Sequence, residues 1–140
     1  MGIFVSKSAG KTKKIAGDLA KRWLKSKLRK KALIIGLIGE LGSGKTVFIQ
    51  GFAKALGIKE RVVSPTFILM RRHGNFYHFD CYRIKNFKEI LDLGWRKIID
   101  NPENIILIEW AEKIKKILPK NYIKINFEHV DRNKRKISLA

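Results

Sequence analysis

An eight-residue run, Gly39-Glu40-Leu41-Gly42-Ser43-Gly44-Lys45-Thr46, fits the pattern G-x-x-x-x-G-K-[ST] at every position. Glycines let a backbone wrap closely around an anion, so that several N–H groups point inward, and the N-terminus of a following helix adds a favourable potential. The lysine of such a loop reaches the β- and γ-phosphates, and the hydroxyl after it ligates Mg²⁺. The run is therefore predicted to be a phosphate-binding P-loop, and its predicted nucleotide contacts are Glu40, Leu41, Gly42, Ser43, Gly44, Lys45 and Thr46.

The segments on either side of the P-loop have the pattern that such a loop requires. Residues 32–38 form an apolar run that predicts a buried strand. After the loop, an apolar face at helical spacing predicts a helix that Gly57 ends. The members of that face are Val47, Phe48, Phe52 and Leu56. A strand, the loop and a helix in this order support the phosphate-binding interpretation.

Two acidic residues end apolar runs further along the chain. Asp80 follows residues 76–79, and Glu109 follows residues 105–108. Since ligands of open α/β sheets bind at the C-terminal edge of the strands, both carboxylates are expected on the same sheet edge as the P-loop. Mg²⁺ prefers oxygen ligands, and either acid could be the Walker B carboxylate, directly or through water. Glu112 either faces this site or is a solvated helix residue.

The run Ser64-Pro65-Thr66-Phe67 falls where many P-loop proteins place a switch segment. A hydroxyl in such a segment can sense the γ-phosphate through Mg²⁺ or water, so Thr66 is a candidate switch residue. Arg83 could neutralise phosphate charge. A structural salt bridge is an equally good interpretation of Arg83.

Length and composition limit the possible classes of protein. The chain has 140 residues and 45% hydrophobic residues, which predicts one domain over residues 1–140. No run approaches the roughly 18 apolar residues of a membrane helix, and the N-terminus lacks the apolar centre of a secretory signal. Gly2 and Ser6 match the N-myristoylation pattern, but Phe4 and Val5 fit a strand better. The single cysteine, Cys81, excludes an internal disulfide and suits a reducing cytosol, so a cytoplasmic location is expected.

The charge of the chain is strongly positive, with a formal net charge of +19 at pH 7. An excess of this size favours polyanionic partners such as nucleic acid. Residues 25–31 carry the densest group of cations. This cluster either contacts an anionic partner or is a solvated helix end, where cations complement the helix dipole.

The remaining pattern predicts an α/β fold: a P-loop three-layer sandwich whose central sheet is mostly parallel, with antiparallel additions. A helix capped by Ser8 is expected over residues 9–28, with Ile15, Ala16, Leu19, Ala20, Trp23 and Leu24 as its buried stripe. The other expected helices cover residues 88–92, 95–99 and 111–118. The other expected strands cover residues 3–6, 62–70, 76–80, 104–110, 122–127 and 136–140, the second and third of which form a hairpin.

Other phosphate chemistries fit less well. A guanine-specific GTPase would carry Asn-Lys-x-Asp, whereas residues 133–136 read Asn-Lys-Arg-Lys. A small-molecule kinase needs an acceptor pocket and an arginine-bearing lid, and the chain has little length for both. The three histidines, His73, His78 and His129, show no metal-ligand spacing.

Taken together, these motifs resemble the TsaE (YjeE) family, the small P-loop ATPases of bacterial tRNA threonylcarbamoyladenosine synthesis. Their order and spacing follow the family along the whole chain. The stretches that carry the resemblance are Gly39–Thr46, Ser64-Pro65-Thr66-Phe67, His78-Phe79-Asp80-Cys81-Tyr82-Arg83, Leu93-Gly94, Ile108-Glu109-Trp110 and Leu118-Pro119. Cys81 departs from the family's usual leucine, and Ala111 from its usual proline, but neither position touches the chemistry.

The resemblance implies roles for individual residues. Lys45 and the P-loop amides would bind the phosphates of ATP, and Thr46 and Glu109 would hold Mg²⁺. Asp80 would occupy the Walker B position, and Thr66 would belong to the switch segment. Four further residues stand near positions that contact nucleotide in relatives: Ser8, Thr12, Glu112 and Arg132.

The resemblance also implies an accessory ATPase that does not itself transfer the threonylcarbamoyl group. It would act with the TsaB–TsaD complex, be weak alone, and support modification of the adenosine beside the tRNA anticodon, which suits a basic protein in contact with tRNA. Two alternatives remain open. One is a P-loop phosphotransferase acting on a small metabolite, and the other is a basic RNA-binding module whose P-loop only binds nucleotide.

Overall fold

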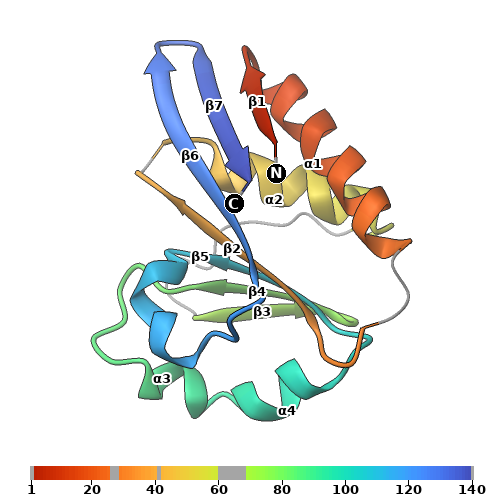
Figure 1. Ribbon diagram of the computed structural model, residues 1–140, viewed down its shortest axis with the longest axis vertical. Helices are drawn as coiled ribbons and strands as arrows, with labels where there is room; N and C mark the ends of the chain where they lie inside the picture. Colours follow the sequence, from red (N-terminus) through yellow and green to blue (C-terminus); the bar gives the residue numbers. More distant parts are fainter. Residues whose placement is uncertain (1, 26–28, 41, 60–68, 140) are drawn as a thin grey trace. The chain divides into compact units, whose positions relative to one another are not determined.

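The computed structural model describes residues 2–25, 29–40, 42–59 and 69–139. The chain divides into two compact units (Figure 1). Unit 1 combines Met1–Lys27, Gly39–Ser64 and Ile125–Ala140, and unit 2 combines Leu28–Ile38 and Pro65–Lys124. That residues 1–140 act as a single domain stays a prediction.

Unit 1 contains a small antiparallel sheet and two helices. Strand β1 pairs with β7, and β7 pairs with β6. The elements are β1 (Ile3–Ser6), α1 (Ala9–Leu24), α2 (Lys45–Ala55), β6 (Ile123–Asp131), of which all but the first two residues belong to this unit, and β7 (Lys134–Leu139). The two C-terminal strands are longer than predicted, because only Arg132 and Asn133 separate them.

Helix α1 starts as the sequence predicts. Ser8 is in an extended conformation and its Oγ accepts a hydrogen bond from the Lys11 backbone N–H at 3.1 Å, which makes it the N-cap. The stripe is buried at Ile15, Ala16, Leu19 and Ala20 and half-buried at Trp23 and Leu24. The helix ends at Leu24 and not at residue 28, and residues 26–28 lie outside the described part.

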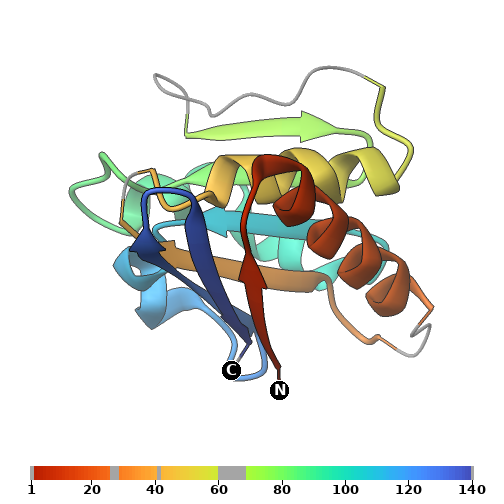
Figure 2. The same cartoon turned by 90° about the horizontal axis from the view of Figure 1, so that it is seen from above.

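Helices α1 and α2 lie side by side (Figures 1 and 2) and approach each other closely at Gly51. An ideal Cβ on Gly51 would lie 2.6 Å from the Lys13 Cα. Next to this crossing, the Trp23 and Phe52 rings lie 6.2 Å apart, and Phe48 meets Phe127 of β6 edge to face at 5.4 Å. Glycine at position 51 therefore permits the helix contact that closes the core of unit 1.

Unit 2 contains a mostly parallel sheet. Strand β2 pairs with β5, and β5 with β4, both in parallel, while β3 is an antiparallel addition beside β4. The strands are β2 (Leu33–Gly39), β3 (Met70–His73), β4 (Phe76–Asp80) and β5 (Ile105–Glu109). The predicted hairpin is present, but its first strand extends to His73 and does not end at residue 70, so that only Gly74, at φ 61°, and Asn75 separate the two strands. Residues 60–68 of the predicted strand lie outside the described part.

Three helical segments pack on one face of this sheet. They are α3 (Lys88–Leu91), α4 (Trp95–Asp100) and the 3₁₀ helix η1 (Ala111–Ile117). Trp95 meets Phe79 edge to face at 5.4 Å, and its Nε1–H donates to the Ile117 carbonyl at 3.3 Å. Since side chains alternate along a strand, Tyr77 and Phe79 point to this core while His78 and Asp80 belong to the opposite face.

The α/β class with a mostly parallel centre is confirmed. The short helix expected after β5 is present over Ala111–Ile117, where it has the 3₁₀ form and is interrupted at Ile114. It follows Trp110, which has φ 58°, the left-handed region that side chains seldom adopt. Within the described ranges, no helix has both the length and the apolar character needed to cross a lipid bilayer.

Candidate functional site

The P-loop connects β2 to α2 through glycines with positive φ. Gly42 has φ 77° and Gly44 has φ 102°, and Gly44 is the N-cap of α2 without a side-chain hydrogen bond. The Ser43 backbone N–H donates to the Glu40 carbonyl at 3.2 Å, and Leu41 lies outside the described part. No side chain caps α2. The backbone N–H groups of its first turn are therefore oriented toward the position that a ligand bound in the loop would take.

Gly39 is needed because strand β6 lies against the loop. An ideal Cβ at position 39 would meet the Phe127 carbonyl oxygen at 2.6 Å and the Ser43 Oγ at 2.9 Å. No side chain fits there without moving backbone. The close approach holds the start of the loop against β6.

Two polar side chains of the loop are buried. Lys45 is only 4% exposed, and its ammonium group donates to the Gly39 carbonyl, which folds the side chain back over the loop. Ser43 is 1% exposed, and its Oγ has no hydrogen-bond partner among the described residues. A buried ammonium, an unsatisfied hydroxyl and the helix amides form a donor set that fits an oxyanion such as phosphate.

In unit 2, the two predicted acids end adjacent parallel strands. Asp80 of β4 stands in register with Glu109 of β5, and Glu109 in register with Leu37 of β2. Two residues after Leu37, β2 ends at Gly39, where the P-loop begins in the sequence. Asp80 is half-buried, and its Oδ1 accepts the Tyr82 backbone N–H at 3.0 Å, so this carboxylate also fixes the turn after β4.

Glu109 has a buried partner that the sequence did not indicate. Its Oε2 lies 2.8 Å from His78 Nε2, with side-chain exposures of 5% and 0%. An ionised carboxylate only accepts hydrogen bonds, so Nε2 carries the hydrogen. The two carboxylates lie at the ends of neighbouring strands, and an imidazole holds one of them. Together they form an oxygen donor set that suits Mg²⁺.

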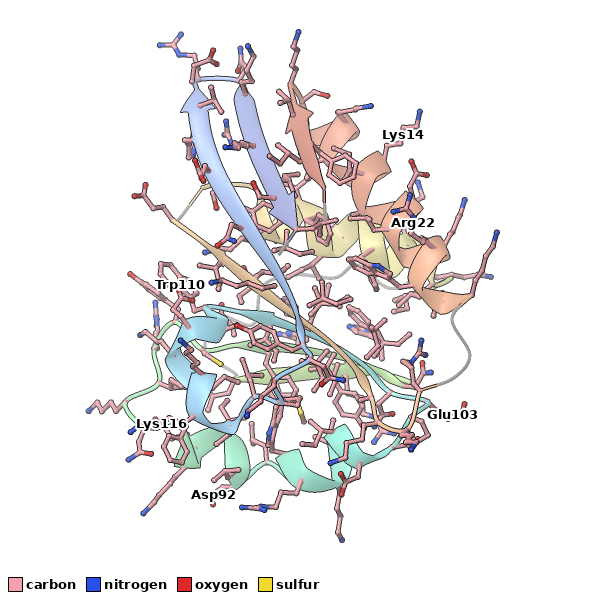
Figure 3. All side chains as sticks on the ribbon, in the orientation of Figure 1. Lys14, Arg22, Asp92, Glu103, Trp110 and Lys116 are labelled. Carbon is pink, nitrogen blue, oxygen red and sulfur yellow. The ribbon has the colours of Figure 1, made fainter. Side chains whose placement is uncertain are left out.

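The other predicted nucleotide contacts are distributed as follows. Thr12 is buried with its hydroxyl 2.7 Å from that of Ser6, so this hydroxyl is used inside unit 1. Ser8 is exposed at the start of α1, and Arg132 is exposed in the turn between β6 and β7. Glu112 is exposed in the first turn of η1, two residues after Trp110, which Figure 3 labels. Thr66 lies outside the described part.

Two histidines near these groups had no predicted role. His129 of β6 lies beside the loop, because an ideal Cβ on Gly42 would be 3.7 Å from its Nε2. His78 stands two residues before Asp80 on the same strand face, and this spacing is the one signal that could have revealed it. Within the described ranges, no group of three or more histidine, cysteine, aspartate or glutamate side chains is placed to hold a metal ion.

Comparisons with known proteins point to one family. The family model described as "Threonylcarbamoyl adenosine biosynthesis protein TsaE" matches residues 6–137. A Rickettsia felis protein called tRNA threonylcarbamoyladenosine biosynthesis protein TsaE is 41% identical over 111 residues, which are 76% of this chain and 64% of that protein. A Treponema pallidum protein of the same name is 32% identical over 124 residues, covering 85% of this chain and 91% of that protein.

The fold agrees with this relationship. The crystal structure of YdiB from Bacillus subtilis superimposes with a TM-score of 0.73 at 26% sequence identity, covering 99% of this chain and 83% of that one. The matched residues include the complete P-loop and both strand-end acids. The chain belongs to the TsaE family of tRNA threonylcarbamoyladenosine biosynthesis proteins.

Proposed function

We propose that the protein binds Mg²⁺-ATP at its P-loop, hydrolyses it slowly, and thereby supports threonylcarbamoylation of the adenosine beside the tRNA anticodon together with TsaB–TsaD in the cytoplasm. The observation that carries the proposal is the P-loop itself. Its glycines have positive φ, α2 begins without a side-chain cap, and the buried Lys45 and Ser43 direct polar groups into the loop.

Each P-loop group has a proposed task at the nucleotide. Lys45 exchanges its contact with the Gly39 carbonyl for the β- and γ-phosphates. The amides from Gly42 to Thr46 hold the phosphate oxygens at the start of α2. The four peripheral contacts, Ser8, Thr12, Glu112 and Arg132, remain proposals of the family resemblance, and Thr12 would have to release Ser6 to reach a ligand.

Thr46 and Glu109 are the proposed Mg²⁺ ligands, with Asp80 in the Walker B position. The ion would neutralise charge that develops on the phosphates. Asp80 and Glu109 end neighbouring strands, and Glu109 is in register with the strand that continues as the P-loop. This arrangement in unit 2 supports a shared role for both acids on one nucleotide.

The proposed need for a partner follows from two groups that ATP hydrolysis uses and that the sequence does not clearly provide. No sequence motif supplies an arginine finger or a base for the attacking water, and an added arginine contributes on the order of 10³–10⁵ in rate in GTPase systems. A site of this kind is expected to be slow alone. Thr66 is the proposed switch residue through which TsaB–TsaD would respond to the γ-phosphate.

Steady-state ATP hydrolysis with and without TsaB–TsaD, at matched magnesium, tests the proposal. We expect weak turnover alone, clear stimulation by the partner complex, and loss of both in Lys45→Ala, since a charge-assisted contact contributes about 1.5–3 kcal/mol. Thr66→Ala should lower the stimulated rate more than the affinity for ATP. Fast turnover whose rate does not change when TsaB–TsaD is added would favour an independent enzyme. Phosphoryl transfer to a metabolite would favour the kinase alternative.

A further inference from the structure

His78 is a fully buried ionisable side chain beside the candidate site. It lies in the middle of β4 with no exposed surface, and Nε2 donates to Glu109 Oε2 at 2.8 Å. The two residues come from adjacent parallel strands, where His78 is in register with Leu107, two residues before Glu109. The pair therefore rests on the sheet itself and not on a loop.

The second ring nitrogen of His78 shows that this imidazole is not placed for packing alone. Nδ1 is buried and has no hydrogen-bond partner among the described residues. A buried polar atom without a partner destabilises the folded state, and an apolar side chain would avoid this cost. Apart from the two acids at the strand ends, the neighbours on the same face of β4 and β5 are apolar: Phe76, Ile105 and Leu107. What His78 adds to that face is the bond to Glu109.

We propose that His78 is a positioning residue that fixes the Glu109 carboxylate for Mg²⁺. This inference rests on the proposed function, in which Glu109 is a magnesium ligand. A hydrogen bond donated by a buried imidazole restrains the orientation of the carboxylate that accepts it. Outer-shell partners of metal-binding carboxylates act in this way, and losing one typically lowers metal affinity 10- to 100-fold.

Asp80 is oriented by a different device. Its Oδ1 accepts the backbone N–H of Tyr82, so the local turn holds it and it does not need His78. Removing the imidazole should therefore affect Glu109 and spare Asp80. This difference separates a positioning role from a general loosening of the strand edge.

The magnesium gain tests the inference. We define it as the dissociation constant of a fluorescent ATP analogue in EDTA divided by that in saturating Mg²⁺. In His78→Leu the gain should fall 10- to 100-fold, with binding in EDTA unchanged. His78→Gln, whose amide N–H can replace Nε2–H, should keep most of it. In a Glu109→Gln background, His78→Leu should add little further loss, because the charged carboxylate that His78 positions is already absent.

Phe76→Leu is the matched control, since Phe76 is equally buried on the same face of the same strand. It should lower stability without changing the magnesium gain. An unchanged gain in His78→Leu, beside a wild-type protein that shows a gain, overturns the inference alone. A wild-type protein with no gain overturns the inference together with the proposed magnesium site.

If His78→Leu fails to fold, His78→Gln and His78→Asn provide the same comparison. The shorter asparagine cannot place its N–H where Nε2 lies, so it should show a lower magnesium gain than glutamine. Equal gains in these two variants overturn the inference.

Discussion

At the scale of single residues, the thiol that follows Asp80 is the group whose chemistry the fold changes most clearly. Cys81 is fully buried, and burial, followed by the negative charge of Asp80, raises its pKa from the ordinary 9.0 to about 12. The thiolate is the reactive form of cysteine. A pKa three pH units higher leaves roughly 1,000-fold less thiolate at pH 8.

Cys81 should therefore resist alkylation in the folded protein. Iodoacetamide at pH 8 should label it very slowly in buffer and rapidly in denaturant, as measured by intact mass. Since the folded pKa lies above the unfolded one, the contribution of Cys81 to stability is complete below pH 9 and is lost as the pH rises toward 12. Rapid native labelling would show that the strand end opens easily.

The two acids are predicted to respond differently to loss of charge. Glu109→Gln keeps the size of the side chain and an acceptor for His78, so the fold should survive while magnesium-dependent turnover collapses. Circular dichroism and steady-state ATP hydrolysis measure the two effects. If Asp80→Asn abolishes turnover and Glu109→Gln does not, Asp80 and not Glu109 is the acid that holds the metal.

At the scale of elements, the contact between α1 and α2 depends on one glycine. In Gly51→Ala the new Cβ would lie 2.6 Å from Lys13 Cα and O, which are backbone atoms that move only if a helix moves. We expect a loss of about 1–3 kcal/mol in the free energy of unfolding, measured in urea. Gly17→Ala is the control, because its Cβ would lie 3.7 Å from the Ala55 Cβ, and it should add about 0.5–1 kcal/mol. Equal effects of both changes would contradict the close approach.

The elements that the sequence predicted best are those with a strong local signal. The five buried residues of β5, the capped start of α1 and the glycine-rich loop each follow from periodicity or turn chemistry. The 3₁₀ form of η1 could not be predicted, because it follows the left-handed conformation of Trp110, whose ring lies 5.0 Å from that of Tyr82. The pairing of His78 with Glu109 joins residues 31 positions apart, and only the strand order brings them together.

At the scale of the whole molecule, some of the excess positive charge lies on exposed lysines whose positions the structure describes. Lys14, Lys21 and Lys25 are exposed at seven- and four-residue spacing, which places them on one face of α1 and its C-cap, Lys25. Figure 3 shows Lys14 extending away from β1. Lys31, in the cluster predicted at residues 25–31, forms an exposed ion pair with Asp100 at 3.5 Å. The α1 face is therefore the better-defined candidate for the proposed tRNA contact.

Neutralising this face should weaken tRNA binding and flatten its dependence on salt. Each cation that contacts a phosphate contributes about −0.7 to −0.9 to the slope of log affinity against log salt, so changing Lys14, Lys21 and Lys25 to Gln should make the slope less negative by up to about 2.7. The control changes Lys85, Lys88 and Lys97, also exposed, to Gln, and lowers the net charge equally. Filter binding of tRNA over a range of salt concentrations measures both slopes. If the two triple variants shift the slope equally, the effect comes from total charge, and the α1 face is an ordinary solvated helix surface.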